Sequence, residues 1–162
     1  MISFTIAEIP DLSTRLQADL SQAVIEQAAD AIVVADRQGR VLVWNAAAQT
    51  VFGYAAREAL GRRLDLIIPE RFRSAHWTAF DRAIATGQTN HGGEAMTTRS
   101  VTKDGTDLYV DISFALVKDD AGEVLAVVAV ARDVTTRYTA ERELRRRVAE
   151  LEAQLKAESS GG

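Results

Sequence analysis

Three β-rich segments follow one another between residues 94 and 134, and no other feature of the sequence constrains the fold as strongly. They cover residues 94–103, 107–117 and 123–134, and only the short turns KDG and KDDAG separate them. Connections this short join antiparallel neighbours, because a parallel pair needs a crossover of a dozen or more residues. The third segment is almost entirely apolar, so we expect it in the centre of an antiparallel sheet.

The middle segment alternates between apolar and mixed positions. Every second side chain of a strand points to the same face. This rule puts five large apolar residues of the segment on one face: Leu108, Val110, Ile112, Phe114 and Leu116. On the other face, Asp111 and Ser113 are polar whereas Tyr109 and Ala115 are not. The sheet is therefore expected to have one apolar inner face.

The first half of the chain predicts a hairpin followed by helices. Residues 31–35 and 40–44 are β-rich and flank DRQG, which is typical of a tight turn. Three helical segments follow, and each ends at a glycine, namely Gly53, Gly61 and Gly87. Pro69 and Glu70 suit the first turn of the third and longest segment.

Both ends of the chain carry amphipathic helical patterns. Leucine, valine and alanine recur every four residues from Leu12 to Ala28, and Asp11 or Ser13 could cap this helix. Near the other end, apolar residues spaced four, three and four apart form a two-heptad seam, which consists of Leu144, Val148, Leu151 and Leu155. We divide the chain into a tail and helix (1–27), a domain (28–134), a coiled-coil helix (135–157) and a flexible tail (158–162).

Composition excludes several classes of function. The 162 residues are 47% hydrophobic, carry a net charge of −4 and include no cysteine. Nucleic-acid binding is therefore not expected, nor are disulfides, thiolate metal sites or cysteinyl flavin chemistry. No apolar run is long enough for a membrane span and no export signal is visible, so we expect a cytoplasmic protein. No nucleophile–base pair or phosphate-binding glycine loop indicates an enzyme.

Three stretches in this order resemble the PAS sensor domain. They are AIVVADRQGRVLVWNAAAQTVFGYAAREALGRRLDLIIP, VTKDGTDLYVDISFALV and VAVARDVTTR, which together span residues 31–137. The resemblance implies an α+β fold with a five-stranded antiparallel sheet and short helices on one face, flanked by the two amphipathic helices. PAS domains bind many ligands or none, so the fold alone does not identify a ligand.

His76 is similar in position to the iron ligand of one PAS branch, the heme-binding oxygen sensors. The resemblance implies b-type heme held by His76, a propionate contact from Arg82, and Ile112 and Phe114 against the porphyrin. Those sensors carry an arginine that donates to bound oxygen, where this chain has Met96. A thioether cannot donate a hydrogen bond, but it can ligate iron. We therefore expect His76/Met96 ligation or an apolar distal side, with carbon monoxide, nitric oxide or redox state as the signal.

Simpler interpretations of these residues stay open. A single histidine is more often a packing or surface residue than a ligand, and Met96 on a strand is more often core filler. Trp44 is expected in the core rather than at a flavin, and His91 in a solvated loop.

The sequence thus leaves two main functions. The first is a non-enzymatic, homodimeric PAS sensor that binds heme and relays its state through the C-terminal helix to an unidentified signalling partner. The second is a module without ligand, or with another small molecule, that acts through protein–protein contact and dimerisation.

Overall fold

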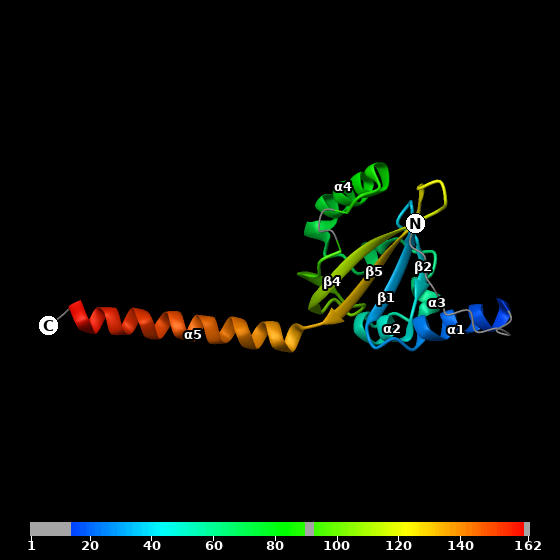
Figure 1. Cartoon of the computed structure of the whole chain (residues 1–162). Coiled ribbons are helices and arrows are strands. Elements are labelled where there is room, and N and C mark those ends of the chain that lie inside the picture. The colour runs from blue at the N-terminus through cyan, green and yellow to red at the C-terminus, as the bar shows by residue number, and fades with distance from the viewer. Residues whose placement is uncertain (1–13, 90–92, 161–162) are drawn as a thin grey trace.

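The computed structural model describes residues 14–89 and 93–160, and a single antiparallel sheet forms the centre of this part of the chain (Figure 1). Its strands are β1 (Ala31–Asp36), β2 (Val41–Trp44), β3 (Met96–Val101), β4 (Asp107–Lys118) and β5 (Val124–Asp133). They lie in the order β2-β1-β5-β4-β3, and every neighbouring pair is antiparallel. The prediction of a five-stranded antiparallel sheet with the most apolar strand at its centre is confirmed.

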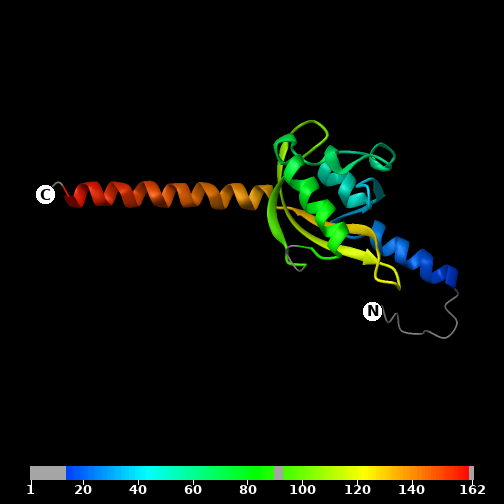
Figure 2. The ribbon, with the colours of Figure 1, turned by 90° about the horizontal axis from the view of Figure 1, so that it is seen from above.

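Helices connect the two halves of the sheet and extend from its ends (Figures 1 and 2). They are α1 (Thr14–Glu26), α2 (Ala46–Phe52), α3 (Ala56–Ala59), a 3₁₀ turn η1 (Leu64–Leu66), α4 (Glu70–Thr86) and α5 (Thr135–Ser160). Gly53 and Gly87 end α2 and α4 in the left-handed conformation, as the sequence predicts. The expected tail before Pro10, the caps at Asp11 and Ser13 and the loop around His91 lie outside the described residues.

Strand β3 is shorter than the predicted segment 94–103. The backbone turns directly after Val101, because the N–H of Gly105 donates to the carbonyl of Thr102 at 3.0 Å. The N–H of Thr106 also donates to the hydroxyl of Thr102 at 3.0 Å. The turn around KDG therefore starts one residue earlier than its sequence suggests.

The core lies between α2 and the inner face of the sheet. Its most completely buried large side chains include Phe52, Val41 and Val110, and each such apolar side chain contributes about 1.5–3 kcal/mol of burial energy. Trp44 is also buried, and its indole N–H donates to the Tyr54 carbonyl at 3.0 Å. The prediction that Trp44 belongs to the core is confirmed.

Asn45 connects three elements from a fully buried position. Its Oδ1 accepts hydrogen bonds from the backbone N–H groups of Ile32 and Ala48, both at 2.9 Å. Its Nδ2 donates to the carbonyls of Ile25 and Asp30, both at 3.0 Å. One amide side chain thereby caps α2 and fixes the segment between α1 and β1, a role that the sequence analysis did not identify.

The two terminal helices leave their apolar residues in solvent. In α1, Leu16, Leu20 and Val24 are 49%, 50% and 62% exposed. All four residues of the α5 seam are exposed as well. Both stripes are therefore largely exposed within the part of the chain that the structure describes. None of the described helices combines the length and apolar character needed to cross a bilayer.

Helix α4 is fixed to the β1–β2 turn by Trp77. The Trp77 indole N–H donates to Asp65 at 2.8 Å, and the Arg63 guanidinium lies 4.0 Å from the centre of the ring. The ring lies against Gly39, where an added Cβ would come within 2.3 Å of it. Only glycine therefore permits this close contact between helix and turn.

We expect Gly39→Ala to destabilise the domain more than Gly61→Ala does. Both glycines have φ of +74°, but a Cβ at Gly61 would meet nothing within 4 Å. In both variants the free energy of unfolding should fall by about 1 kcal/mol, because alanine is disfavoured in the left-handed backbone conformation. Gly39→Ala should lose a further 1–3 kcal/mol or so, because Trp77 has to move. Urea unfolding measures the difference, and equal losses would contradict the role of Trp77.

Candidate functional site

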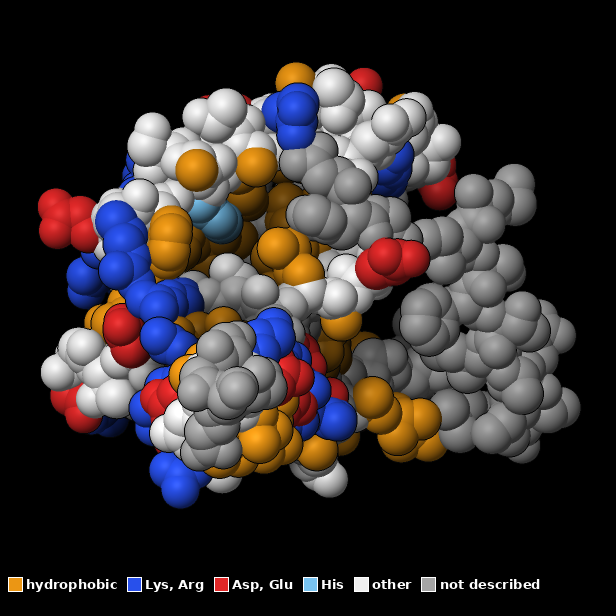
Figure 3. All heavy atoms as spheres, turned by 90° about the vertical axis from the view of Figure 1, so that its left-hand side faces the viewer, with side chains coloured by type: hydrophobic (Ala, Val, Ile, Leu, Met, Phe, Trp, Pro, Cys, Tyr) orange, Lys and Arg blue, Asp and Glu red, His pale blue; other side chains and the backbone are white. Residues whose placement is uncertain are grey.

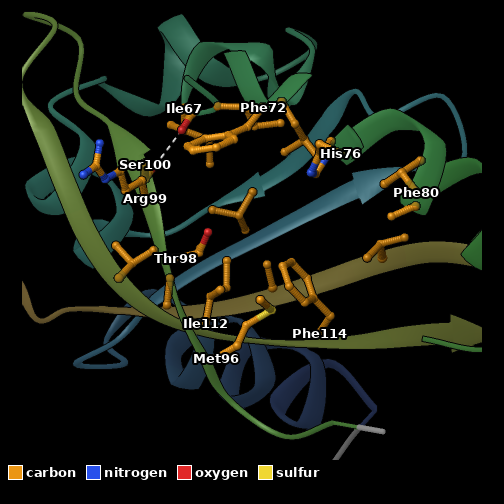
Figure 4. Close-up of a pocket in the computed structure, with 18 of the residues that line it drawn as sticks. Ile67, Phe72, His76, Phe80, Met96, Thr98, Arg99, Ser100, Ile112 and Phe114 are labelled. Carbon is orange, nitrogen blue, oxygen red and sulfur yellow. Dashed lines mark hydrogen bonds between the residues drawn. The ribbon is translucent and has the colours of Figure 1, made fainter. Parts of the chain in front are cut away.

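A cavity of about 400 Å³ separates α4 from the inner face of the sheet. This volume lies within the usual range for small-molecule sites in proteins. Figure 3 shows a hollow surrounded by hydrophobic side chains, and Figure 4 shows the walls from close by. The domain thus has an open space where a fully packed α+β domain would have core.

The sheet forms one wall of this cavity through its predicted apolar face. Ile112, Phe114 and Leu116 of β4 line it, together with Val127 and Ala129 of β5. The prediction that alternate residues of β4 share one apolar face is confirmed by this arrangement.

Helix α4 forms the opposite wall with one stripe of its surface. The lining residues recur at helical spacing and are Phe72, Ala75, His76, Ala79, Phe80 and Ala83. Phe72 lines the cavity and remains 40% exposed. The apolar stripe of α4 is therefore directed at a cavity rather than at a neighbouring element.

His76 is the polar exception on this stripe. Its Nε2 is buried and has no hydrogen-bond partner among the described residues. Burial lowers the pKa of His76 from its ordinary value, although the negative charge of Asp65 acts in the opposite direction. The imidazole is consequently neutral at pH 7 and keeps a lone pair. Buried polar atoms almost always have partners, so this exception requires an explanation.

Three of the other residues predicted for a site lie together in this cavity. Met96 of β3 pairs directly with Ile112 of β4, and both line the cavity with Phe114. Figure 4 shows Met96 on the wall opposite His76. Arg82 is exposed on α4 and does not line the cavity. The structure thus brings four of the five predicted residues together, whereas Arg82 lies outside.

Two hydroxyl residues of β3 belong to the site and were missed by the sequence analysis. Thr98 and Ser100 follow Met96 at alternate positions and share its face, which was the available signal. The Thr98 hydroxyl points into the cavity (Figure 4). The Ser100 hydroxyl instead donates to the Ile67 carbonyl at 2.6 Å, which ties β3 to the segment before α4.

The described residues include no group of three or more His, Asp or Glu side chains suited to a metal ion. The chain also has no cysteine. A metal in this cavity would therefore have to enter within a larger cofactor, because one imidazole and one thioether do not complete a coordination sphere.

Comparison with known proteins identifies one family and several sensors. The sequence model of the family described as PAS fold matches residues 25–139. The oxygen sensor protein DosP of Escherichia coli is 27% identical over 111 residues, which are 68% of this chain and 14% of DosP. The sensor protein FixL of Bradyrhizobium diazoefficiens is 26% identical over 92 residues, which are 57% of this chain and 18% of FixL. The chain thus spans less than a fifth of these relatives.

A solved structure shows the same fold. The PAS domain of a Colwellia psychrerythraea protein superimposes with a TM-score of 0.65 at 21% identity, covering 74% of this chain and 98% of that domain. At this level of identity the similarity concerns the fold alone.

We expect His76 to make stability depend on pH. Its pKa is lowered in the folded chain, so the unfolded chain takes up more protons as pH falls below about 6.5. The stability that the neutral imidazole provides is complete above that pH and is lost toward the lower folded pKa. Between pH 7.5 and pH 5.5, the free energy of unfolding measured in urea should therefore fall more for the native chain than for His76→Gln. Equal losses in the two proteins would contradict the shift.

Proposed function

Because this chain belongs to the PAS family of sensory and signalling domains, we propose that its cavity binds b-type heme through His76. The observation that carries this proposal is the buried Nε2 of His76, which lacks a partner among the described residues and borders an apolar cavity. A neutral imidazole on a helix is a suitable axial iron ligand, since the helix fixes its direction. The similarity to a relative named as an oxygen sensor supports the same ligand.

The residues of the cavity fit this cofactor. Its walls are apolar on both sides, as a flat porphyrin requires, and Ile112 and Phe114 provide the surface on the sheet side. Bound heme would supply an iron atom that takes up small gases or changes its redox state. The carboxylates of heme lie at the edge of the cofactor that faces solvent. The exposed guanidinium of Arg82 is suited to pair with them, and not to contact the porphyrin ring.

Met96 determines which signal such a site would report. It lies on the wall opposite His76, and its thioether can ligate iron but cannot donate a hydrogen bond. Stable oxygen binding would lack a donor from this position, so carbon monoxide, nitric oxide or redox state is the more suitable signal. We further propose that the domain is a sensor rather than an enzyme.

A second candidate is a PAS module that binds another small molecule, or none, and acts through protein contact. The open apolar cavity and the Thr98 hydroxyl suit a small apolar molecule with one polar group. The spectrum of the purified protein separates this candidate from a heme sensor.

We expect protein prepared with heme to show a strong Soret absorption band that His76→Ala abolishes. Thr78→Ala is the matched control, because Thr78 is exposed on the same helix and does not line the cavity. Met96→Leu should keep the band but change it from a six-coordinate to a five-coordinate form in the reduced state. Normal heme loading by His76→Ala would exclude His76 as the ligand.

The exposed apolar seam of α5 supports a homodimer as the signalling form. The α5 seam presents Leu144, Val148, Leu151 and Leu155 to solvent, and two heptads are marginal alone. Pairing with a second copy would bury them, and α1 would add its own stripe. A signalling partner, of unidentified kind, would then receive the state of the α5 pair.

We expect Leu151→Glu to weaken the dimer and Ala153→Glu to leave it intact. Both add the same charge to α5, but Leu151 is on the seam and Ala153 is two positions further, on the opposite face. Burial of two carboxylates in the seam should raise the dissociation constant at least tenfold or so, since each leucine contributes about 1.5–3 kcal/mol. Analytical ultracentrifugation measures this, and equal dimer strength in both variants would exclude the seam.

A further inference from the structure

Strand β3 has one face on the cavity and the other toward α5. Met96, Thr98 and Ser100 line the cavity, while Thr97 and Arg99 alternate with them and point the other way. Arg99 also borders the cavity, but its guanidinium points away from it in Figure 4. A shift of this strand therefore displaces side chains on the cavity face and on the opposite face together.

The first connection from β3 to α5 is polar, and we call it the first rung (Thr97, Asp111 and Arg137). Thr97 pairs directly with Asp111 of β4, and its hydroxyl donates to that carboxylate. The other oxygen of Asp111 accepts a hydrogen bond from Arg137 of α5 at 2.6 Å. One carboxylate thus bridges the edge strand and the exit helix.

The second connection is aromatic, and we call it the second rung (Arg99, Tyr109 and Tyr138). Arg99 pairs directly with Tyr109, and its guanidinium lies 5.2 Å from the centre of the Tyr109 ring. That ring stacks on Tyr138 of α5, with 3.8 Å between centres and 20° between planes. The Tyr109 backbone also binds the start of α5, since its N–H donates to the Thr135 hydroxyl at 3.0 Å.

The two rungs run side by side. Thr97 and Arg99 are successive outward residues of β3, and Arg137 and Tyr138 are consecutive in the first turn of α5. Strand β5 leads into α5 directly, but it lies between β1 and β4 and is bonded on both sides. Strand β3 is at the edge of the sheet and β4 is its only strand partner among the described residues, so it can move at a lower energetic cost than the strands paired on both sides.

We propose that these two rungs transmit the state of the cavity from β3 to the first turn of α5. The proposal rests on the proposed function only in that a ligand is the natural cause of a shift in β3. A displaced β3 moves Asp111 and Tyr109 relative to Arg137 and Tyr138, which changes how firmly the first turn of α5 is held. The α5 seam begins at Leu144, less than two turns beyond Tyr138, so the orientation of this turn sets the direction of the seam.

The test replaces the ligand by a substitution in the cavity. Thr98→Leu adds apolar volume on the inner face of β3 without changing either rung. Asp111→Ala with Tyr138→Leu removes the bridging carboxylate of the first rung and the stacked ring of the second. Asp107→Ala with Thr136→Leu is the matched control on the same strand and the same helical turn. Amide hydrogen exchange of residues 136–142 is the readout in all backgrounds.

We expect Thr98→Leu to change these exchange rates by about two- to thirtyfold in the native and control backgrounds, the range of roughly 0.5–2 kcal/mol of coupling. In the background with both rungs broken the change should vanish. An equal change there, or none in the native background, would overturn the proposal. Should the double variant fail to fold, Tyr138→Leu alone is expected to reduce the change, and an undiminished change would count against it.

Heme binding distinguishes this proposal from the proposed function. The variant with broken rungs is expected to bind heme with native affinity, because its substituted residues Asp111 and Tyr138 do not line the cavity. It is also expected to lose any heme-dependent change in exchange at α5. A native chain that takes up no heme would refute the heme proposal. The comparison based on Thr98→Leu would still decide whether the rungs transmit a change in the cavity to α5.

Discussion

The contact between Trp77 and Gly39 fixes α4, one wall of the cavity, to the β1–β2 turn. It holds α4 at the β1–β2 turn through a large ring that also bonds to Asp65 and lies under Arg63. An amphipathic helix without such an anchor would lower its energy by settling its stripe onto the apolar sheet. Because the anchor is at one side of α4, the neighbouring residue His76 is left facing the space that remains. Trp77 thus packs against the turn, while the adjacent His76 faces the cavity.

An open apolar cavity bordered by a buried nitrogen without a hydrogen-bond partner has an energetic cost that a purely structural domain has no reason to bear. The exposed apolar lining and the Nε2 of His76, which has no partner among the described residues, both reduce stability. Proteins concentrate such departures from ideal packing at functional sites. A ligand that contacts both walls and bonds to Nε2 would remove both penalties together, so its binding would also stabilise the fold.

The sequence predicted what depends on local periodicity, and the structure adds what depends on contacts distant in sequence. Alternation in β4 predicted the apolar inner face of the sheet, and the resemblance to the PAS domain implied that His76, Met96, Ile112 and Phe114 share one site. The contact of Trp77 with Gly39 and the four hydrogen bonds of Asn45 could not be foreseen, because they join segments whose proximity only the folded chain creates. The exposed position of Arg82 is a further difference, since its expected contact was implied by the resemblance to the heme-binding sensors.

The arrangement of the sheet separates stability from responsiveness. The inner strands β1, β5 and β4 have strand partners on both sides and carry much of the buried core, so they form its rigid part. The cavity instead extends to the edge strand β3, which is tied to the segment before α4 by Ser100 and to the exit helix by two rungs. A sensor needs a wall that moves before its core does, and an edge strand has strand-pairing hydrogen bonds on one side only. The outward residues of β3 are thus as much a part of the sensory function as those that face the cavity.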